Sequence, residues 1–274
     1  MKRLVLVFLA LVFSALLISA VRPDLTGTNA NVVPSRGHAR VTIPANAVEV
    51  APGVFSLGSA VVNGRNVEGY ALVHYKNGLS AKSGNVIYTS PCYAFLSNGA
   101  KWKTIEPWIV NPANIRGLDS NFVFSNLDID ILKWETSAGK NILGSGSITS
   151  DILSADTSSP DNKNEVYFAE IANPGVIAMT VIWGRFSGPV SQRVLVEWDQ
   201  VYDDVDFDWS ASGEAGKMDF ENIATHELGH SVGMNDLYTT ACSAQTMYGY
   251  ASLGETKKRT LEAGDRTGVK KLYA

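Results

Sequence analysis

The chain has 274 residues, of which 45% are hydrophobic, and its formal net charge at pH 7 is −4. A chain of this length can bury a substantial core, so we expect one main domain with an N-terminal extension. The negative charge and the absence of a long basic run argue against a nucleic-acid-binding protein.

The N-terminus has the pattern of a targeting segment. Met1-Lys2-Arg3 is positively charged, residues 4–19 are almost wholly apolar, and Ala20 suits cleavage by a signal peptidase. We therefore interpret residues 1–20 as a signal peptide and expect a secreted, extracellular protein. The apolar run is also near the minimum length of a membrane span, so an uncleaved membrane anchor is the alternative.

Residues 21–91 have the pattern of a small β-rich region. Residues 53–57 and 70–75 are predicted to be strands, whereas residues 26–37 resemble a loose linker.

Residues 92–274 have the pattern of an α+β domain. A long helix is predicted after Asp119 or Ser120, because apolar residues then recur at the helical period. Strands are predicted where β-branched and aromatic residues cluster, at residues 108–110, 165–168, 176–183 and 194–198. Asp219 is a candidate N-cap of a later helix. We expect a twisted mixed sheet packed on the long helix.

The run His226-Glu227-Leu228-Gly229-His230 indicates that this later helix carries metal ligands. Residues four apart lie on nearly the same face of a helix, so His226 and His230 can bind one ion. Zinc in a hydrolytic site takes three protein ligands and lowers the pKa of a water in the fourth position. Glu227 is then placed to take a proton from that water and pass it to the leaving group.

Gly233 and Asp236 complete the predicted site. A helix that continued without a break would carry residue 236 beyond the metal. Glycine tolerates the left-handed conformation at which helices often end, so a break at Gly233 can return the chain and make Asp236 the third ligand.

This pattern resembles the metzincin signature His-Glu-x-x-His-x-x-Gly-x-x-His, with Asp236 in place of the third histidine. Residues 245–250 look like the Met-turn of that family, and residues 261–273 look like the closing helix of its matrixin branch. The resemblance implies a zincin-like catalytic domain with a zinc helix, a Met-turn and a C-terminal helix. It also implies that Met247 lies beneath the metal as a hydrophobic floor without binding it.

The resemblance implies a secreted zinc-dependent endopeptidase, and we expect a monomer that acts on protein or peptide substrates. An exposed sheet edge would hold the substrate as an added strand. We expect one catalytic zinc and no second zinc bound by histidines, because His38 and His74 lie too far upstream to match the family's structural site. Calcium is an option at Asp203–Asp208, although a solvated acidic loop is the alternative there.

On the same resemblance, residues 21–91 are interpreted as a propeptide that blocks the cleft, which leaves residues 92–274 as the catalytic domain. The alternative is a small β module that stays attached. Two other functions stay open: a metal-dependent amidase of non-protein substrates, and a non-catalytic metal-binding homologue. The intact Glu227 argues against the second.

Cys92 and Cys242 are the only cysteines. Two cysteines in an exported protein predict one disulfide. The alternative is that Cys92 acts as a switch that binds the zinc of a latent enzyme, as in many matrixins. The sequence Ser90-Pro91-Cys92-Tyr93 does not match that family's switch, and a switch would leave Cys242 unpaired. We therefore favour the disulfide.

Overall fold

The strand order of one central sheet decides which segments meet at the candidate site. A computed structural model of the chain describes residues 39–76 and 92–274. All of them belong to one unit, Val32–Ala274. The predicted signal peptide, the predicted linker and His38 lie outside the described residues.

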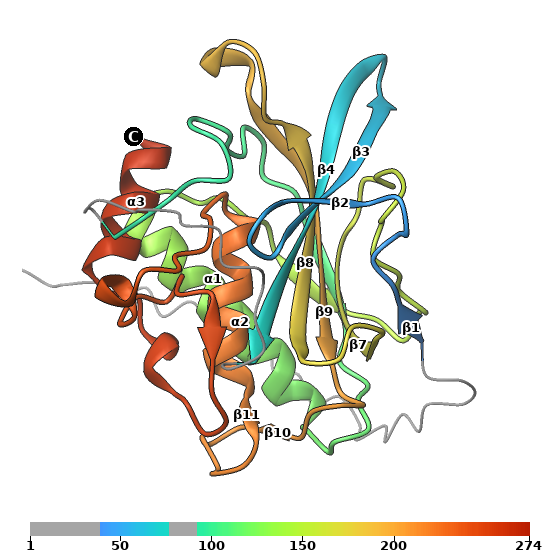
Figure 1. Cartoon of the computed structure of the whole chain (residues 1–274), viewed down its shortest axis with the longest axis vertical. Helices are drawn as coiled ribbons and strands as arrows, with labels where there is room; N and C mark the ends of the chain where they lie inside the picture. The colour runs from blue at the N-terminus through green and yellow to red at the C-terminus, as the bar shows by residue number, and fades with distance from the viewer. Residues whose placement is uncertain (1–38, 77–91) are drawn as a thin grey trace, which may run out of the picture. The chain divides into compact units, whose positions relative to one another are not determined.

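The sheet is mixed, and its main strands follow the order β2-β3-β4-β8-β9-β7-β5-β6 (Figure 1). Their bounds are β2 Val48–Ala51, β3 Val54–Val62, β4 Arg65–Lys76, β5 Trp108–Asn111, β6 Gly146–Ile148, β7 Asn164–Ile171, β8 Val176–Arg185 and β9 Val194–Asp203. Strands β6, β5, β7 and β9 are parallel to one another, whereas β8 is antiparallel to both β9 and β4. Two short strands pair at the margins, β1 (Arg40–Val41) with β7 and β12 (Tyr250–Ala251) with β4.

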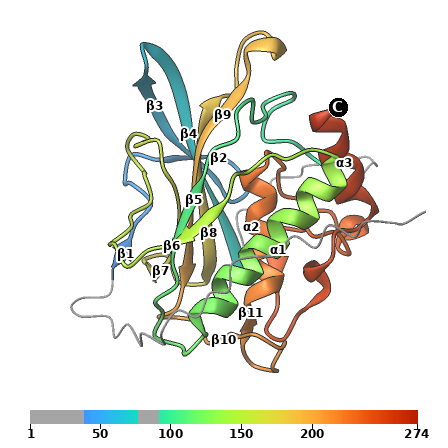
Figure 2. The same ribbon diagram turned by 180° about the vertical axis from the view of Figure 1, so that it is seen from behind.

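Three α-helices lie together on one side of the sheet (Figures 1 and 2). They are α1 Ser120–Ala138, α2 Phe220–Ser231 and α3 Ala263–Tyr273. Short 3-10 turns and a two-strand ladder occupy the connections: η1 Val190–Gln192, η2 Thr240–Cys242, η3 Lys257–Arg259, β10 Trp209–Ser210 and β11 Met218–Asp219. None of the helices in the described part of the chain has both the length and the apolar character needed to cross a bilayer.

Both faces of the central strands β7, β8 and β9 are buried. On the helix side, Trp134 of α1 and Trp198 of β9 are fully buried in one apolar cluster with Phe220 of α2. On the other side, Val181 and Trp183 of β8 belong to a second buried cluster. Burial of apolar surface on this scale is the main force that holds the layers together.

The strands and the long helix predicted for residues 92–274 are confirmed, with longer bounds than the local pattern indicated. Asp119 caps α1 by accepting a hydrogen bond from the amide of Phe122, and α1 ends at Gly139, whose φ of 68° suits glycine. Local capping signals are therefore reliable guides here.

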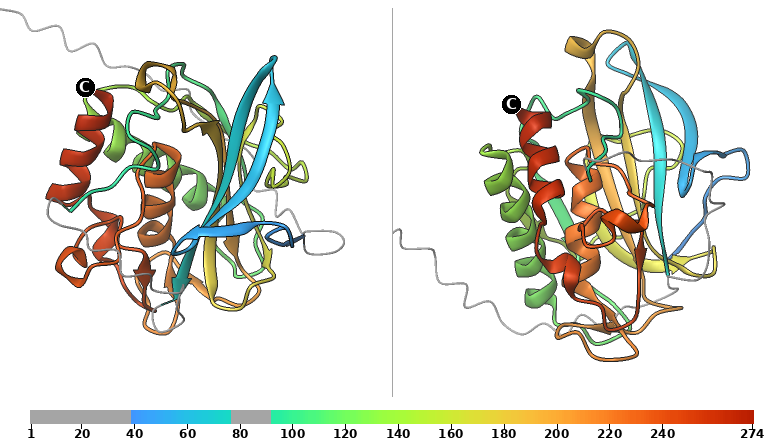
Figure 3. Two further views of the ribbon diagram at one scale, coloured as in Figure 1. Left: turned by 45° about the horizontal axis from the view of Figure 1, so that its top comes forward. Right: turned by 60° about the vertical axis from the view of Figure 1, so that its left-hand side comes forward.

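The expectation of an exposed sheet edge is wrong for β8. Strand β4 pairs with β8 over eight residue pairs, from Glu68–Gly184 to Tyr75–Val176. Figure 3 shows the β3–β4 hairpin continuing the sheet beyond β8. The physical reason is that β4 buries apolar side chains on both of its faces, including Ala71, Leu72 and Val73. The predicted strands upstream of residue 77 thus extend the same sheet.

Cys92 and Cys242 form a disulfide in the structure, as we favoured. It joins Cys92 to η2, the short 3-10 turn in the connection after α2. Neither cysteine is therefore a free thiol that a zinc ion would bind.

We predict that the double variant Cys92→Ser/Cys242→Ser unfolds more easily. The bond spans 150 residues, so the chain-entropy model gives a loss of about 2–5 kcal/mol in free energy of unfolding. Urea denaturation measures that loss. Thiol titration of the folded wild type should find no reactive thiol until a reductant is added, and two reactive thiols would contradict the pairing.

Candidate metal centre

Helix α2 carries two of the predicted metal ligands and is held rigidly. Asp219 caps it, because its carboxylate accepts a hydrogen bond of 3.0 Å from the amide of Asn222. The indole of Trp134 donates to the carbonyl of Thr225 at 2.9 Å and ties the helix to α1. The apolar residues on the side of α2 opposite the histidines, which include Leu228, are also buried.

His226, His230 and Asp236 converge on one point. Asp236 Oδ1 lies 3.2 Å from His226 Nε2 and 3.6 Å from His230 Nε2. Zinc binds nitrogen and oxygen at about 2.0–2.2 Å, so two ligand atoms of a tetrahedral site lie about 3.3 Å apart. The spacing of the three side chains matches that geometry.

Hydrogen bonds fix both imidazoles in the form that binds a metal. His226 Nδ1 lies 2.7 Å from the carbonyl oxygen of Thr246, and His230 Nδ1 lies 3.1 Å from that of Met234. A carbonyl only accepts, so each Nδ1 carries the proton and each Nε2 presents a lone pair toward Asp236.

The charges agree with this assignment. Burial, with Lys258 adding to it, lowers the pKa of His226 to about 3, and burial also lowers the pKa of His230. Burial opposes ionisation of Asp236, but His230 and His226 outweigh it and hold the pKa of that carboxyl below its ordinary value. Neutral imidazoles and an ionised carboxylate are the states that bind a divalent cation.

Two buried atoms of the group have no hydrogen-bond partner among the described residues, His226 Nε2 and Asp236 Oδ1. Leaving a buried polar atom unsatisfied costs about 1–3 kcal/mol. A cation between them would satisfy both. Two imidazole nitrogens and one carboxylate oxygen are a donor set that zinc accepts in hydrolytic sites, so the residues fit zinc.

The break predicted at Gly233 brings Asp236 to this point. The α-helix ends at Ser231, and Gly233 has a φ of 101°. A Cβ there would also approach the carbonyl oxygen of Ala100 to 3.0 Å, so the position requires glycine on two grounds. The Tyr238 hydroxyl then donates to Asp236 Oδ2 at 3.1 Å and holds the carboxylate in place.

Met247 lies fully buried against α2. A Cβ on Gly229 would come within 2.2 Å of the Met247 sulfur, so only glycine lets the methionine pack there. Our sequence analysis assigned no role to Gly229. A glycine inside a helix is unfavourable by about 1 kcal/mol, and that fact was the available signal of a close contact.

Asp265, at the start of α3, holds the Met247 segment and was also missed. Its carboxylate accepts hydrogen bonds from the amides of Thr246 at 2.8 Å and Met247 at 3.2 Å. It accepts a third from the amide of Glu262 and so closes the capping box of α3. Because the Thr246 carbonyl orients His226, Asp265 supports the candidate metal ligands indirectly.

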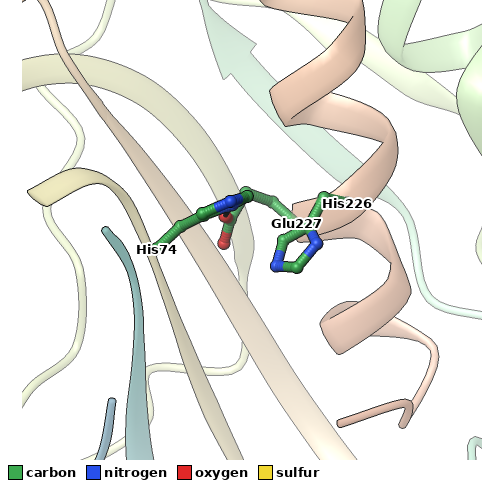
Figure 4. A group of neighbouring side chains, drawn as sticks. All are labelled: His74, His226 and Glu227. Carbon is green, nitrogen blue, oxygen red and sulfur yellow. Dashed lines mark hydrogen bonds and ion pairs between the residues drawn. The ribbon is translucent and has the colours of Figure 1, made fainter. Parts of the chain in front are cut away.

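Glu227 is fully buried beside the candidate ligands, and both of its carboxylate oxygens have partners. Oε2 accepts a hydrogen bond of 2.6 Å from the Thr180 hydroxyl of β8. Oε1 lies 3.1 Å from Nδ1 of His74, which reaches it from β4 (Figure 4). Burial raises the pKa of Glu227 to about 8.

His74 in turn contacts a buried lysine. Its Nε2 lies 2.9 Å from Lys258 Nζ, which also donates to the carbonyl of Tyr248. Burial lowers the pKa of Lys258 to about 7. Burial, with His226 and Lys258 adding to it, holds the pKa of His74 well below its ordinary value. Sequence analysis gave His74 no place in the site, since only the pairing of β4 with β8 brings it there.

In the acidic loop considered for calcium, three carboxylates have hydrogen-bond or ion-pair partners within the protein. Asp203 accepts hydrogen bonds from three backbone amides, and Asp204 accepts one from the amide of Ile115. Asp208 pairs with Arg116. Within the described ranges, these carboxylates are not grouped as metal ligands.

A different carboxylate group has that geometry, namely Asp156, Glu197 and Asp199. One ligand atom from each lies within 4.8 Å of the others. Glu197 is almost fully buried, and its Oε1, like Asp156 Oδ2, has no hydrogen-bond partner in the described structure. Residues 197 and 199 lie on β9, and residue 156 precedes β7.

Residues 194–274 match the family model of the matrixins, a group of metallopeptidases. The matched stretch runs from β9 to α3 and contains the three predicted ligands, Glu227 and Met247. No curated protein matches the chain.

We predict that Asp265→Asn weakens both the fold and the site. The amide group that replaces a carboxylate oxygen would face backbone donors, which costs about 1–3 kcal/mol in free energy of unfolding. Zinc affinity should fall as the Thr246 carbonyl moves. Urea denaturation and zinc titration measure the two effects. Asp128→Asn, at an exposed position of α1, is the matched control, and equal behaviour of the two variants would refute the role of Asp265.

Proposed function

We propose that this matrixin-like chain of the metzincin type is a secreted zinc-dependent endopeptidase. The family match supports a zinc metallopeptidase in general. One observation carries the finer proposal: two imidazole nitrogens and a carboxylate oxygen face one another in a buried space, with Glu227 directly beside them. That arrangement suits hydrolysis of a peptide bond by an activated water.

The proposed roles follow from the contacts. His226, His230 and Asp236 would hold the zinc, which supplies Lewis acidity to the scissile carbonyl and to a water molecule. Glu227 would accept a proton from the water and donate it to the leaving amine. The Thr180 hydroxyl orients the Glu227 carboxylate.

Secretion is proposed on the N-terminal pattern and on the disulfide, since disulfides persist in oxidising compartments. The alternative substrates are non-protein amides, because a fold alone does not decide the substrate. The intact Glu227, which is buried next to His226, argues against the alternative of a non-catalytic metal-binding protein.

We expect Glu227→Gln to bind about one zinc per chain, as the wild type does, and to lose proteolysis. An amide cannot act as the general base, so the rate of casein cleavage should fall by at least about 100-fold. Metal analysis and cleavage of fluorescent casein, each with and without a chelator, measure the two properties.

Glu106→Gln, in an exposed loop, serves as the control and should leave the rate unchanged. A Glu227→Gln variant that cleaves casein at the wild-type rate would exclude the proposed mechanism. Zinc binding without cleavage by any form would favour the non-catalytic alternative, and cleavage of small amides but not casein would favour an amidase.

We also propose that Asp156, Glu197 and Asp199 bind calcium. Calcium prefers carboxylate oxygens, and the buried Glu197 oxygen without a partner lies within this group. Burial, with Asp156 nearby, raises the pKa of Glu197 to about 8, and burial holds the pKa of Asp199 well above its ordinary value. Without a cation, these acids are therefore most easily accommodated when protonated.

This assignment predicts how stability depends on pH. An acid with a raised pKa in the folded state stabilises the fold at low pH, and that contribution is lost as pH rises. The chelator-treated protein should therefore lose thermal stability between about pH 4.5 and 8, and calcium should restore it most at the upper end. Thermal unfolding at several pH values measures this.

Glu197→Gln should abolish the effect of calcium on the melting temperature, whereas Asp151→Asn, an exposed neighbour, should not. A melting temperature that is indifferent to calcium at pH 8 in the chelator-treated wild type would overturn the assignment.

A further inference from the structure

We propose that a groove between α1 and the start of α3 binds a segment of a partner protein that carries apolar side chains and carboxylates. The groove has a volume of about 410 Å³, and residues of α1, residues 259–261 and one residue of α3 line it. Figure 3 shows the two helices side by side. Three features carry the proposal: apolar side chains that water reaches, cations whose acidic partners lie behind the groove, and the hollow shape of the surface.

Two large apolar side chains of α1 are exposed in the groove. Ile129 and Leu132 lie three positions apart, so they share one face of the helix, and they are 54% and 59% exposed. Leu261 lines the same groove from the other side. A single exposed leucine is ordinary, but a groove lined by three such side chains is a surface that a partner can cover. Other residues, such as Leu127 and Ile131, form the face of α1 that packs in the core.

The charged side chains in the described lining of the groove are all cations, namely Lys133, Arg259 and Arg266. Acidic partners of the first two lie behind them. Asp130 pairs with Lys133 and Asp219 with Arg259, and neither carboxylate has any exposed surface, whereas the two cations are 24% and 28% exposed. A group that enters the groove therefore meets positive charge first.

Arg266 supplies the positive charge that the protein does not balance. Glu221 on α2 also pairs with both Lys133 and Arg259, so those two cations are largely neutralised. Arg266 is exposed on α3. Its guanidinium donates to the carbonyl oxygen of Leu261 and, within the described residues, forms no ion pair with a carboxylate. A guanidinium has five N–H donors, so most of those of Arg266 stay available for a carboxylate of the partner.

The shape of the surface favours a protein segment over a membrane. A membrane surface is flat, and the helices that bind it present their apolar face outward. Here the apolar side chains line a hollow between two helices, which admits one side of a short helix or an extended segment. The partner's apolar side chains would contact Ile129, Leu132 and Leu261, and a neighbouring carboxylate would pair with Arg266.

The groove is separate from the candidate metal centre but adjoins the segment that supports it. None of the candidate ligands lines the groove. Thr260, which does, accepts a hydrogen bond of 2.9 Å at its carbonyl from the Thr246 hydroxyl. The carbonyl of Thr246 in turn orients His226. The proposal concerns binding alone, so it does not depend on the peptidase function.

Binding of two fluorescein-labelled peptides, measured by fluorescence anisotropy, tests the proposal. Both consist of the same numbers of leucine, glutamate and alanine residues. In the first, leucine recurs at every third or fourth position, so a helix of that peptide has one apolar face flanked by glutamates. In the second, the order is scrambled. The full-length Glu227→Gln protein is used throughout, so that the peptides stay intact whatever the activity of the wild type. The first peptide should bind at least about tenfold more tightly than the second.

Two further substitutions locate the binding surface. Arg266→Glu and Leu132→Glu should each weaken binding of the first peptide at least about tenfold, because each places a carboxylate against the peptide's own. Arg65→Glu and Val61→Glu are the matched controls and should bind as the parent protein does. Both control positions are exposed in the β3–β4 hairpin, which Figures 1 and 2 show apart from α1 and α3. Thermal unfolding verifies that each variant is folded.

A third peptide, with lysine in place of glutamate, separates a direct ion pair from a structural effect of the substitution. It should bind Arg266→Glu more tightly than the parent protein, whereas a variant with a damaged groove would bind neither peptide. Equal affinity of Arg266→Glu and Arg65→Glu for the first peptide would overturn the proposal, as would equal binding of the scrambled peptide.

Two other occupants of the groove would also be recognised. Vesicles of anionic phospholipid that displace the first peptide from the protein would make the surface a membrane contact. Sedimentation that shows a dimer of the parent protein and a monomer of Leu132→Glu would assign the groove to a second copy of the chain. Either result would replace the proposed partner.

Discussion

The convergence of two unprotonated imidazole nitrogens on one carboxylate oxygen, inside a fully buried space, is the constraint on which this structure depends. Such a group is unfavourable in an apolar interior unless a cation completes it. The surrounding structure therefore has to keep the three atoms aligned with each ring in one tautomer. The carbonyls of Thr246 and Met234 do this for the rings, and Tyr238 does it for Asp236.

Those supporting groups come from segments far apart in the chain, and packing connects them. Asp265, on α3, holds the segment around Thr246 through a hydrogen bond. The disulfide joins η2, which precedes that segment, to Cys92. Gly229 allows Met247 to sit directly against α2. The geometry of the site thus depends on the whole helical layer. A change at Asp265 on α3 would shift Thr246 and with it the orientation of the His226 ring.

The features that sequence analysis predicted are those with a local physical cause. The caps at Asp119 and Asp219, the break at Gly233 and the i,i+4 pair on α2 each depend on neighbours within a few residues. The ligand set follows from them. Local signals therefore gave the helices, most of the strands and the three converging side chains.

The features that it missed depend on contacts between distant segments. His74 lies 153 residues before Glu227 and meets it only because β4 pairs with β8. The same holds for Lys258, 184 residues from His74, and for the carboxylates that replaced the acidic loop as the calcium candidate. Hydrophobic alternation identified β4 as a strand but carries no information about its partner, since many strands with that pattern would pair equally well.

The position of β4 also explains how a buried general base and a buried lysine coexist in one site. An isolated Glu227 carboxylate and an isolated Lys258 ammonium would each be costly to bury, but a neutral imidazole between them links the two charges through hydrogen bonds. The link needs no net charge on His74, in agreement with the lowered pKa of that ring.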